Sequence, residues 1–196
     1  KITWSFFMNN KFGAKDLITL GIFTVIYFVI GAVLSILVSI PIMVPFFPTV
    51  WALVNGTVFM LYSTKVEKFG LVTLMAVLTG LLVGLTGMGF WCVPTGLVFG
   101  LLGDLIMKKG NYKSFKHNLF GYAVFSISTS GSLIPWYFFA QDTLAKYAAG
   151  GYGTDYGTQV LAITPWWSLL LFVVLNFIGG LLGAIIGKKI MTKHFE

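Results

Sequence analysis

The stretch 165–189 reads PWWSLLLFVVLNFIGGLLGAIIGKK, and it decides the class of fold. It carries no charge before its last two residues. At about 1.5 Å of rise per residue, a helix of this length crosses a hydrocarbon core of about 30 Å. Two tryptophans stand at one end, and Lys188 and Lys189 stand at the other. This pattern is typical of a helix that enters a membrane from outside and ends at the cytoplasm.

Five similar apolar stretches precede it, and lysines lie between the stretches. Together with the last one, the apolar stretches cover 17–40, 44–63, 71–88, 91–107, 118–140 and 165–187. If all of them cross the membrane, Lys146 alone lies on the outer side. The other lysines share the opposite side: Lys1, Lys11, Lys15, Lys65, Lys68, Lys108, Lys109, Lys113, Lys116, Lys188, Lys189 and Lys193. Because cytoplasmic loops collect lysine, both termini should be cytoplasmic.

The chain is therefore predicted to be an all-α membrane protein, a bundle of six transmembrane helices. The six spans lie within 17–196, and residues 1–16 form a cytoplasmic or interfacial segment before them. The composition, 57% hydrophobic and 10% charged, leaves no room for a separate soluble domain.

Several classes of function are disfavoured by what the sequence lacks. The net charge is +7, but there is no arginine, so specific recognition of nucleic acid is not expected. Cys92 is the only cysteine, and His117 and His194 stand apart, so neither a metal site nor a cofactor is expected. No G-x-S-x-G, paired carboxylates or Walker loop occurs, so we expect no enzyme and no ATP hydrolysis by this chain.

Two features inside the apolar stretches have structural interpretations. Glycines recur at four-residue spacing, a pattern that lets helices approach closely in lipid and more often holds a bundle together than binds a partner. These are Gly80 and Gly84, Gly96 and Gly100, and Gly179, Gly183 and Gly187. Asp104 is the acid within a span, which makes it a functional candidate, but Lys108 four residues on and the nearby cytoplasmic end favour a structural ion pair.

Candidate ligand contacts lie near the outer ends of the spans. Trp91, Trp136 and Trp166 mark the outer rim, either as an aromatic belt or as platforms for a planar ring. Asn176 lies about 16 Å deep, where its amide needs either another helix or a ligand. Ser130 belongs to a hydroxyl cluster that could line a pocket opening outward.

Two segments predicted to lie on the outer side differ from simple connections. The stretch 41–48 contains three prolines, which predicts an extended loop or a kinked entry into the second span. The stretch 141–163 is longer than a connection needs and is rich in glycine and tyrosine. It is either a lid or a passive loop. As a lid it would contribute Asp142, Tyr152 and Asp155.

The chain resembles the substrate-binding S components of energy-coupling factor (ECF) vitamin transporters. The resemblance rests on six spans within 196 residues, on KDLITLGIFTV at 15–25, on KSFKHNLFGYA at 113–123 and on GGLLG at 179–183. It implies a multi-pass protein of a bacterial cell membrane. It also implies that a small-residue stripe, here Gly21 with Val25 in place of the usual alanine, docks onto a transmembrane coupling subunit.

The resemblance further implies a mechanism. The S component captures a vitamin or its precursor outside the cell, between the outer halves of spans four to six, where Thr95 would contribute. Two partner ATPases then drive import through the coupling subunit. A hydroxymethylpyrimidine or a pyridoxine-like ring is the substrate we expect. The alternative is a stand-alone channel or secondary carrier for small solutes, which would work without ATP or partners.

Overall fold

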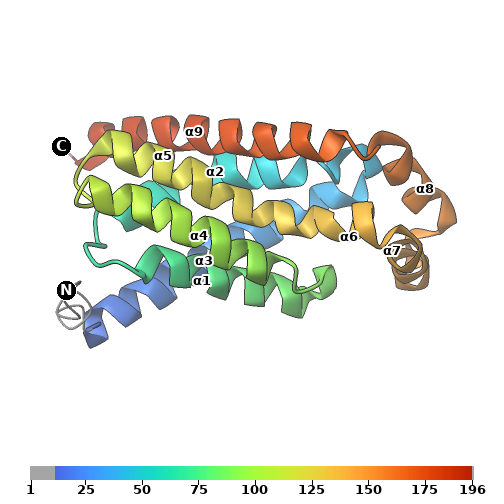
Figure 1. Ribbon diagram of the computed structural model, residues 1–196, viewed down its shortest axis with the longest axis horizontal. Helices are drawn as coiled ribbons and strands as arrows, with labels where there is room; N and C mark the ends of the chain where they lie inside the picture. The colour runs from blue at the N-terminus through green and yellow to red at the C-terminus, as the bar shows by residue number, and fades with distance from the viewer. Residues whose placement is uncertain (1–11, 196) are drawn as a thin grey trace, which may run out of the picture.

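The apolar stretches become long helices in the computed structural model, which describes residues 12–195 (Figure 1). The long helices are α1 (Ala14–Leu34), α2 (Phe47–Ser63), α3 (Leu71–Val83), α4 (Cys92–Lys109), α5 (Phe115–Ser126) and α9 (Ser168–Phe195). Each overlaps one predicted apolar stretch, but α5 covers only the first part of 118–140. The predicted segment 1–16 lies mostly outside the described residues.

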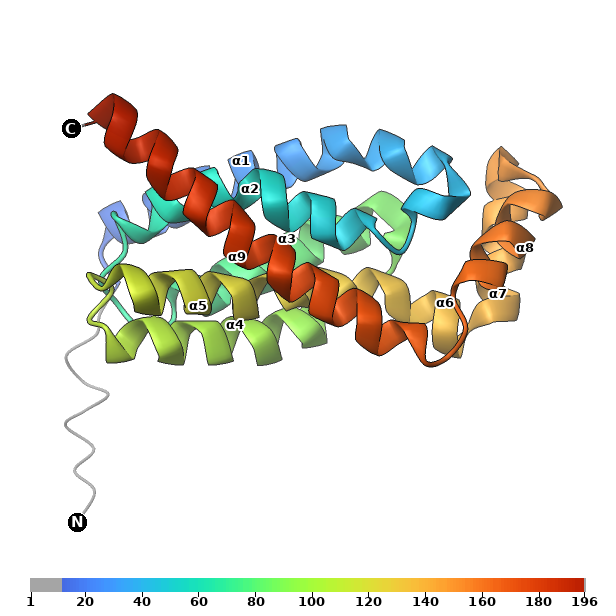
Figure 2. The ribbon, with the colours of Figure 1, turned by 90° about the horizontal axis from the view of Figure 1, so that it is seen from above.

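These helices pack as a closed ring. Along it, α1 contacts α2, α2 contacts α9, α9 contacts α5, α5 contacts α4, α4 contacts α3, and α3 contacts α1 again. Helix α9 crosses the bundle obliquely over α2 and α5 (Figure 2). Each helix therefore has one side toward the interior and another toward the surroundings.

Glycines permit the closest helix contacts. A Cβ atom at Gly183 would lie 2.6 Å from the carbonyl oxygen of Ala52, and one at Gly187 would lie 2.8 Å from the Cα of Thr57. At Gly96 it would lie 2.8 Å from the carbonyl oxygen of Ala76. Backbone atoms cannot move aside as a side chain can. The predicted stripes are thus confirmed as packing surfaces between α2 and α9 and between α3 and α4.

Aromatic side chains fill the middle of the ring. The Phe59 ring centroid lies 4.4 Å from that of Tyr122 and 4.7 Å from that of Phe125. Tyr27 meets Phe125 edge-to-face at 5.8 Å. The Tyr122 hydroxyl donates to the carbonyl oxygen of Ala52 at 2.6 Å, which satisfies a polar group buried among these rings.

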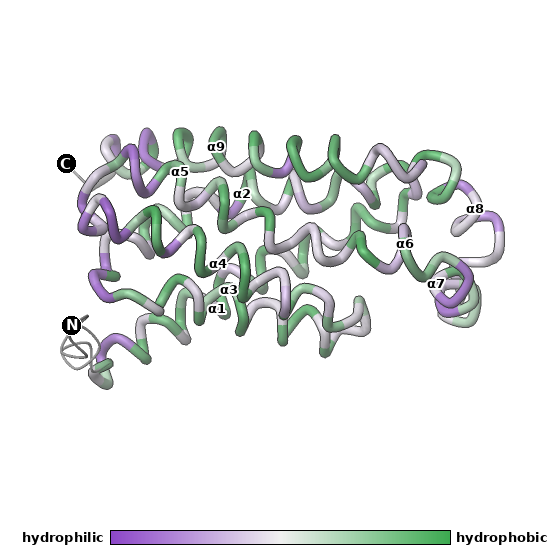
Figure 3. The backbone as a smooth tube through the Cα atoms, viewed as in Figure 1, coloured by the Kyte–Doolittle hydropathy of each residue, from purple (hydrophilic) through white to green (hydrophobic). Residues whose placement is uncertain are grey.

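The outer sides of the helices expose apolar side chains along much of their length. Val29 on α1, Leu97 on α4 and Val174 on α9 are about half exposed. Figure 3 shows hydrophobic residues along the long helices and hydrophilic residues near the two ends of the bundle. Within the described residues, three helices are long and apolar enough to span a membrane, namely Ala14–Ser39, Leu71–Met88 and Ser168–Lys193.

Asp104 has a structural role, carried by hydrogen bonds from the start of α3 and from the loop after α4. Its Oδ2 accepts hydrogen bonds from the backbone N–H of Gly70 at 2.8 Å and from the backbone N–H and hydroxyl of Thr73 at 3.2 and 3.1 Å. The Tyr112 hydroxyl donates to Oδ1 at 2.7 Å. Asp104 on α4 therefore caps the start of α3 and holds the loop after α4.

The fifth predicted span, 118–140, is not a continuous α-helix. After α5 the chain tightens into the 3₁₀ segment η5 (Ile127–Leu133) and continues as the short helix α6 (Ile134–Phe138). The hydroxyls of Ser126, Thr129 and Ser132 each donate to the carbonyl three residues earlier. Pro135 has no N–H to continue an α-helical ladder. Together these groups favour the tighter turn.

The outer segments fold into short helices instead of open loops. The stretch 35–43 forms the 3₁₀ turns η2 (Ser35–Ser39) and η3 (Pro41–Met43), so of the two predicted alternatives the chain makes a kinked entry into α2 and not an extended loop. The stretch 84–88 forms the π-turn η4 (Gly84–Met88). The stretch 140–163 contains α7 (Ala140–Tyr147), η6 (Ala148–Tyr152) and α8 (Thr154–Ile163), hereafter the outer cap.

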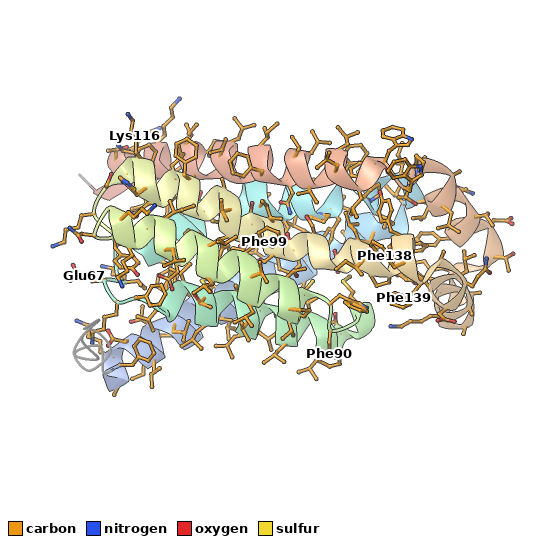
Figure 4. The ribbon with its side chains drawn as sticks, in the orientation of Figure 1. Glu67, Phe90, Phe99, Lys116, Phe138 and Phe139 are labelled. Atoms are coloured by element: carbon orange, nitrogen blue, oxygen red, sulfur yellow. The ribbon has the colours of Figure 1, made fainter. Side chains whose placement is uncertain are left out.

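The two ends of the bundle differ in charge. One end of the bundle holds the start of α1, the end of α9, and the α2–α3 and α4–α5 turns. Figure 4 labels Glu67 and Lys116 at this end. The outer cap lies across the other end. Among the described lysines, only Lys146 belongs to the cap. We call the two ends the lysine-rich end and the capped end.

Candidate ligand-binding site under the outer cap

A cavity of about 240 Å³ lies at the capped end. The start of α2, the turn after α3, the η5–α6 segment and α7 line it, and it is partly open to the surroundings. Apolar side chains form most of its wall: Val38, Val44, Phe47, Met88, Trp91, Leu133, Pro135, Trp136, Phe139 and Tyr147. Its polar lining comes from Ser132, Asp142, Thr143 and Lys146. Such a mixture suits an organic ligand with an apolar body and few polar groups.

Two pairs of aromatic rings border the cavity. Trp136 is 3% exposed, and its ring centroid lies 4.8 Å from that of Tyr147. Trp91 stacks on Phe139 with centroids 5.3 Å apart and ring planes 24° apart. Figure 4 labels Phe139 beside the outer cap. Flat walls of this kind offer van der Waals contact to a planar ring.

The charged groups of the cavity come from α7. Asp142 and Lys146 are one helical turn apart and therefore share a face of that helix. The Lys146 ammonium donates to the carbonyl oxygen of Gly87. Gly87 has a φ of 92°, which favours glycine, and its turn follows α3. This contact ties the outer cap to the turn on the far side of the cavity.

Tyrosines join the outer cap to the α1–α2 connection. The rings of Tyr147 and Tyr156 stack 5.6 Å apart, and Tyr152 lies 4.8 Å from Tyr156. The Tyr156 hydroxyl donates to the carbonyl oxygen of Val38. Burial raises the pKa of the Tyr147 and Tyr156 phenols, so both stay protonated at neutral pH and can donate. Two segments far apart in sequence thus meet over the cavity.

The structure brings some of the predicted contacts together. Trp91, Trp136 and Asp142 line the cavity. Tyr152 is 45% exposed and takes part in the tyrosine cluster above it. These residues come from three separate parts of the chain.

Three other predicted contacts serve helix packing. The Asn176 amide donates to the carbonyl of Ser126 at 2.9 Å and to the hydroxyls of Thr129 and Ser130 at 3.1 and 2.9 Å. Thr95 donates to the carbonyl of Ser128 at 2.7 Å. Asn176, Ser130 and Thr95 therefore hold α9 and α4 against the η5 segment, and the cavity lining does not include them. The 3₁₀ turn exposes carbonyls that these side chains can reach.

Two predicted contacts face outward. Trp166 is 86% exposed in the turn between α8 and α9. Asp155 is exposed in the first turn of α8. Neither lines the cavity. The rim position of Trp166 matches the aromatic-belt interpretation of the outer tryptophans.

Several cavity residues were not among the predicted contacts. Phe47, Met88, Phe139 and Lys146 all line it. Lys146 could have been predicted from the sequence, because it is the single lysine expected on the outer side. The others are apolar residues in apolar surroundings, and only the fold shows that they share one space.

The predicted docking stripe lies on the outward side of α1. Val25 is 54% exposed, and a Cβ atom at Gly21 would meet nothing within 4 Å. Ile18 and Ile22 beside them are 61% and 54% exposed. Unlike the glycines between α2 and α9, Gly21 therefore packs against no other part of the described chain.

The fold and this site together define a class: a helical integral membrane protein with a partly open, aromatic-walled cavity at one end. Residues 14–196 match a family described as a hypothetical bacterial integral membrane protein family (Trep_Strep). The chain belongs to that family, since the match covers nearly its whole length. No curated protein and no solved structure matches the chain. Membership places the protein in a membrane and agrees with a role in transport.

Proposed function

We propose that this protein is the membrane-embedded substrate-binding subunit of an ECF-type importer. In this proposal six helices span the membrane, and the lysine-rich end with both termini is cytoplasmic. The capped end then faces outward. The proposal follows the positive-inside rule, because the described lysines other than Lys146 lie at one end.

One observation carries the proposal: an aromatic-walled cavity lies under a cap at the end opposite the lysines. The cavity of about 240 Å³ can hold one small ligand. Contacts from Tyr156 to Val38 and from Lys146 to Gly87 hold the outer cap beside it. A partly open site with few polar groups is accessible to a compound from outside.

The interior below the cavity supports a binding subunit over the alternative carrier or channel. Phe59, Tyr122 and Phe125 are almost fully buried and fill the ring between the cavity and the lysine-rich end. A stand-alone channel or secondary carrier needs a polar path through this region. In the binding-subunit proposal the ligand crosses with the help of partners, so the aromatic core poses no obstacle.

The partners and the substrate follow from the same proposal. One transmembrane coupling subunit docks on the exposed stripe of α1 around Gly21 and Val25, and two ATPase subunits supply the energy. The chain itself is non-catalytic. The substrate is a vitamin or a vitamin precursor. A planar ring such as hydroxymethylpyrimidine or pyridoxine matches the flat walls at Trp91 and Trp136.

Native mass spectrometry tests the proposal. The chain is co-expressed with candidate coupling and ATPase subunits and solubilised gently. The expected result is a complex of this chain with one membrane subunit and two ATPases, and substrate uptake in liposomes only when all subunits and ATP are present. Uptake by the chain alone, without ATP, would overturn the proposal and favour a carrier.

A further inference from the structure

Four exposed lysines gather where α5 begins and α9 ends, at the lysine-rich end. They are Lys116 on α5 and Lys188, Lys189 and Lys193 on α9, hereafter the α5–α9 lysine cluster. The Lys188 ammonium lies 4.1 Å from the centre of the Phe115 ring, so the two helix ends are in contact here. Figure 4 labels Lys116 at this end of the bundle.

No carboxylate among the described residues pairs with this cluster. At the same end Asp16 pairs with Lys68 at 2.6 Å, and Glu67 pairs with Lys113 at 3.8 Å. Asp104 is buried and already hydrogen-bonded. Neither Phe115–Ser126 nor Ser168–Phe195 contains an acidic residue. The cluster therefore carries a local excess of positive charge, which attracts an anion.

An exposed apolar face of α9 leads directly to the cluster. Ile178, Leu182 and Ile185 are 43%, 49% and 38% exposed. Lys189 and Lys193 continue the same spacing of three or four residues, so all five side chains share one face of the helix. This face is apolar along the bundle and basic at its end.

The exposed face of α9 suits acyl chains better than it suits a partner helix. Helices associate closely in a membrane through small residues. The small residues Gly179, Gly183 and Gly187 of α9 already face the backbone of α2. The exposed apolar positions of α9 carry leucine, isoleucine and valine instead. An apolar face that ends in lysines matches the two parts of an anionic phospholipid, its acyl chains and its phosphate headgroup.

We propose that the α5–α9 lysine cluster binds the headgroup of an anionic phospholipid whose acyl chains lie along the exposed face of α9. A lysine ammonium has three donors and a compact charge, which suits the oxygens of a phosphate diester. Lysines beside a membrane helix are each attracted to anionic lipid. The site lies on the surface at the end opposite the cavity, so it does not depend on the proposed import function.

Native mass spectrometry of the detergent-purified chain tests this inference. The chain is mixed with equal amounts of dioleoyl phosphatidylglycerol, which is anionic, and dioleoyl phosphatidylcholine, which has the same acyl chains and no net charge. The ratio of the two lipid adducts is measured. Lys116→Gln combined with Lys189→Gln removes two charges from the cluster. Lys15→Gln combined with Lys65→Gln is the matched control, since it removes two exposed charges from the same end but from outside the cluster.

We expect the unsubstituted chain to retain phosphatidylglycerol in preference to phosphatidylcholine. The cluster variant should lower the adduct ratio by about fivefold or more, which corresponds to the attraction of a single lysine. The control should change it by less than about twofold, as expected for charges outside the site. Lys116→Arg combined with Lys189→Arg should keep the preference, because both charges remain. Thermal unfolding checks that each variant folds, and Lys189→Gln alone replaces the double variant if that one does not.

Four results would overturn the inference. An equal loss in the control would mean that the charge of the whole end attracts the lipid without a site. Equal retention of both lipids by the unsubstituted chain would exclude an anionic-lipid site. Displacement of the lipid by glycerol phosphate, which has no acyl chains, would assign the cluster to a soluble anion. An unchanged ratio in the cluster variant, with a lower yield of co-purified coupling subunit, would assign this surface to a protein partner.

Discussion

At the scale of single residues, two tryptophans that look alike in the sequence separate in the structure. Trp136 is 3% exposed and lines the cavity, whereas Trp166 is 86% exposed and lies outside it. We predict that Trp136→Ala weakens hydroxymethylpyrimidine or pyridoxine binding by about 1 kcal/mol or more, the contribution of an aromatic pair. Trp166→Ala should leave the affinity unchanged. Titration calorimetry on both variants measures the difference, and equal affinities would remove Trp136 from the site.

Asp104 offers a second residue-scale prediction, one about stability and not binding. Asparagine at this position can keep an oxygen toward the donors of Gly70 and Thr73, but it loses the negative charge that strengthens these hydrogen bonds. Asp104→Asn should therefore destabilise the bundle by about 1.5–3 kcal/mol.

Tyr112→Phe is the graded control for Asp104, since it removes a single donor to the same carboxylate. It should cost about 1 kcal/mol. Thermal unfolding in detergent, followed by size-exclusion chromatography, compares the two variants. If Asp104→Asn proved as stable as the unsubstituted chain, the cap on α3 would not be a stabilising feature.

At the scale of elements, glycine serves two purposes: close packing between two helices at one position and an open helix surface at another. Gly183 faces the backbone of α2, so a larger side chain must push α9 away. Gly21 faces open space on α1. We predict that Gly183→Val destabilises the isolated chain by about 1–3 kcal/mol through overpacking. Gly21→Val should leave its stability unchanged but reduce co-purification with the coupling subunit.

Thermal unfolding and pull-down yields distinguish the two effects. A stable Gly183→Val variant would contradict the close α2–α9 contact. Normal complex formation by Gly21→Val would instead remove this stripe from the proposed docking surface, while leaving the bundle as described.

The positions of the long helices could be predicted from the sequence, and the details of the capped end could not. Spans such as 71–88 follow from hydropathy, because an uninterrupted apolar run has few other solutions in a membrane. The break at Ile127–Leu133 depends on hydroxyls that can bond to their own turn or to solvent, so local pattern leaves it open. In the outer cap, Gly151 and Gly153 adopt positive φ and separate two helices where glycine content indicated a loop.

For the candidate site, the sequence predicted the residues with a distinctive chemistry. Trp91, Trp136 and Asp142, which line the cavity, were predicted because tryptophan and carboxylate are conspicuous near the end of an apolar span. Phe47 and Met88 were missed because an apolar residue in an apolar stretch carries no such signal. Asn176 was chosen for its depth, but its partners turned out to be the hydroxyls and carbonyls of η5.

At the scale of the whole molecule, the two ends are built differently. Hydrogen bonds to Asp104 and an ion pair between Lys68 and Asp16 at 2.6 Å join α1, α3 and α4 at the lysine-rich end. At the capped end the connections are short helices, held by the hydrogen bonds of Tyr156 and Lys146 and by the cluster of tyrosine rings.

The orientation proposed from the lysines can be measured directly. In a Cys92→Ala background, which removes the one native thiol, single cysteines replace Asp155 in the outer cap or Lys113 at the lysine-rich end. Both side chains are exposed, and the Lys113–Glu67 pair is a solvent-exposed contact at 3.8 Å, so neither change should disturb the fold. A membrane-impermeant maleimide should label Asp155→Cys on intact cells and Lys113→Cys only after permeabilisation. The reverse pattern would turn the cavity toward the cytoplasm and exclude capture from outside. Labelling of both on intact cells would show that the two ends share one side, which a chain whose long helices cross the membrane end to end cannot do.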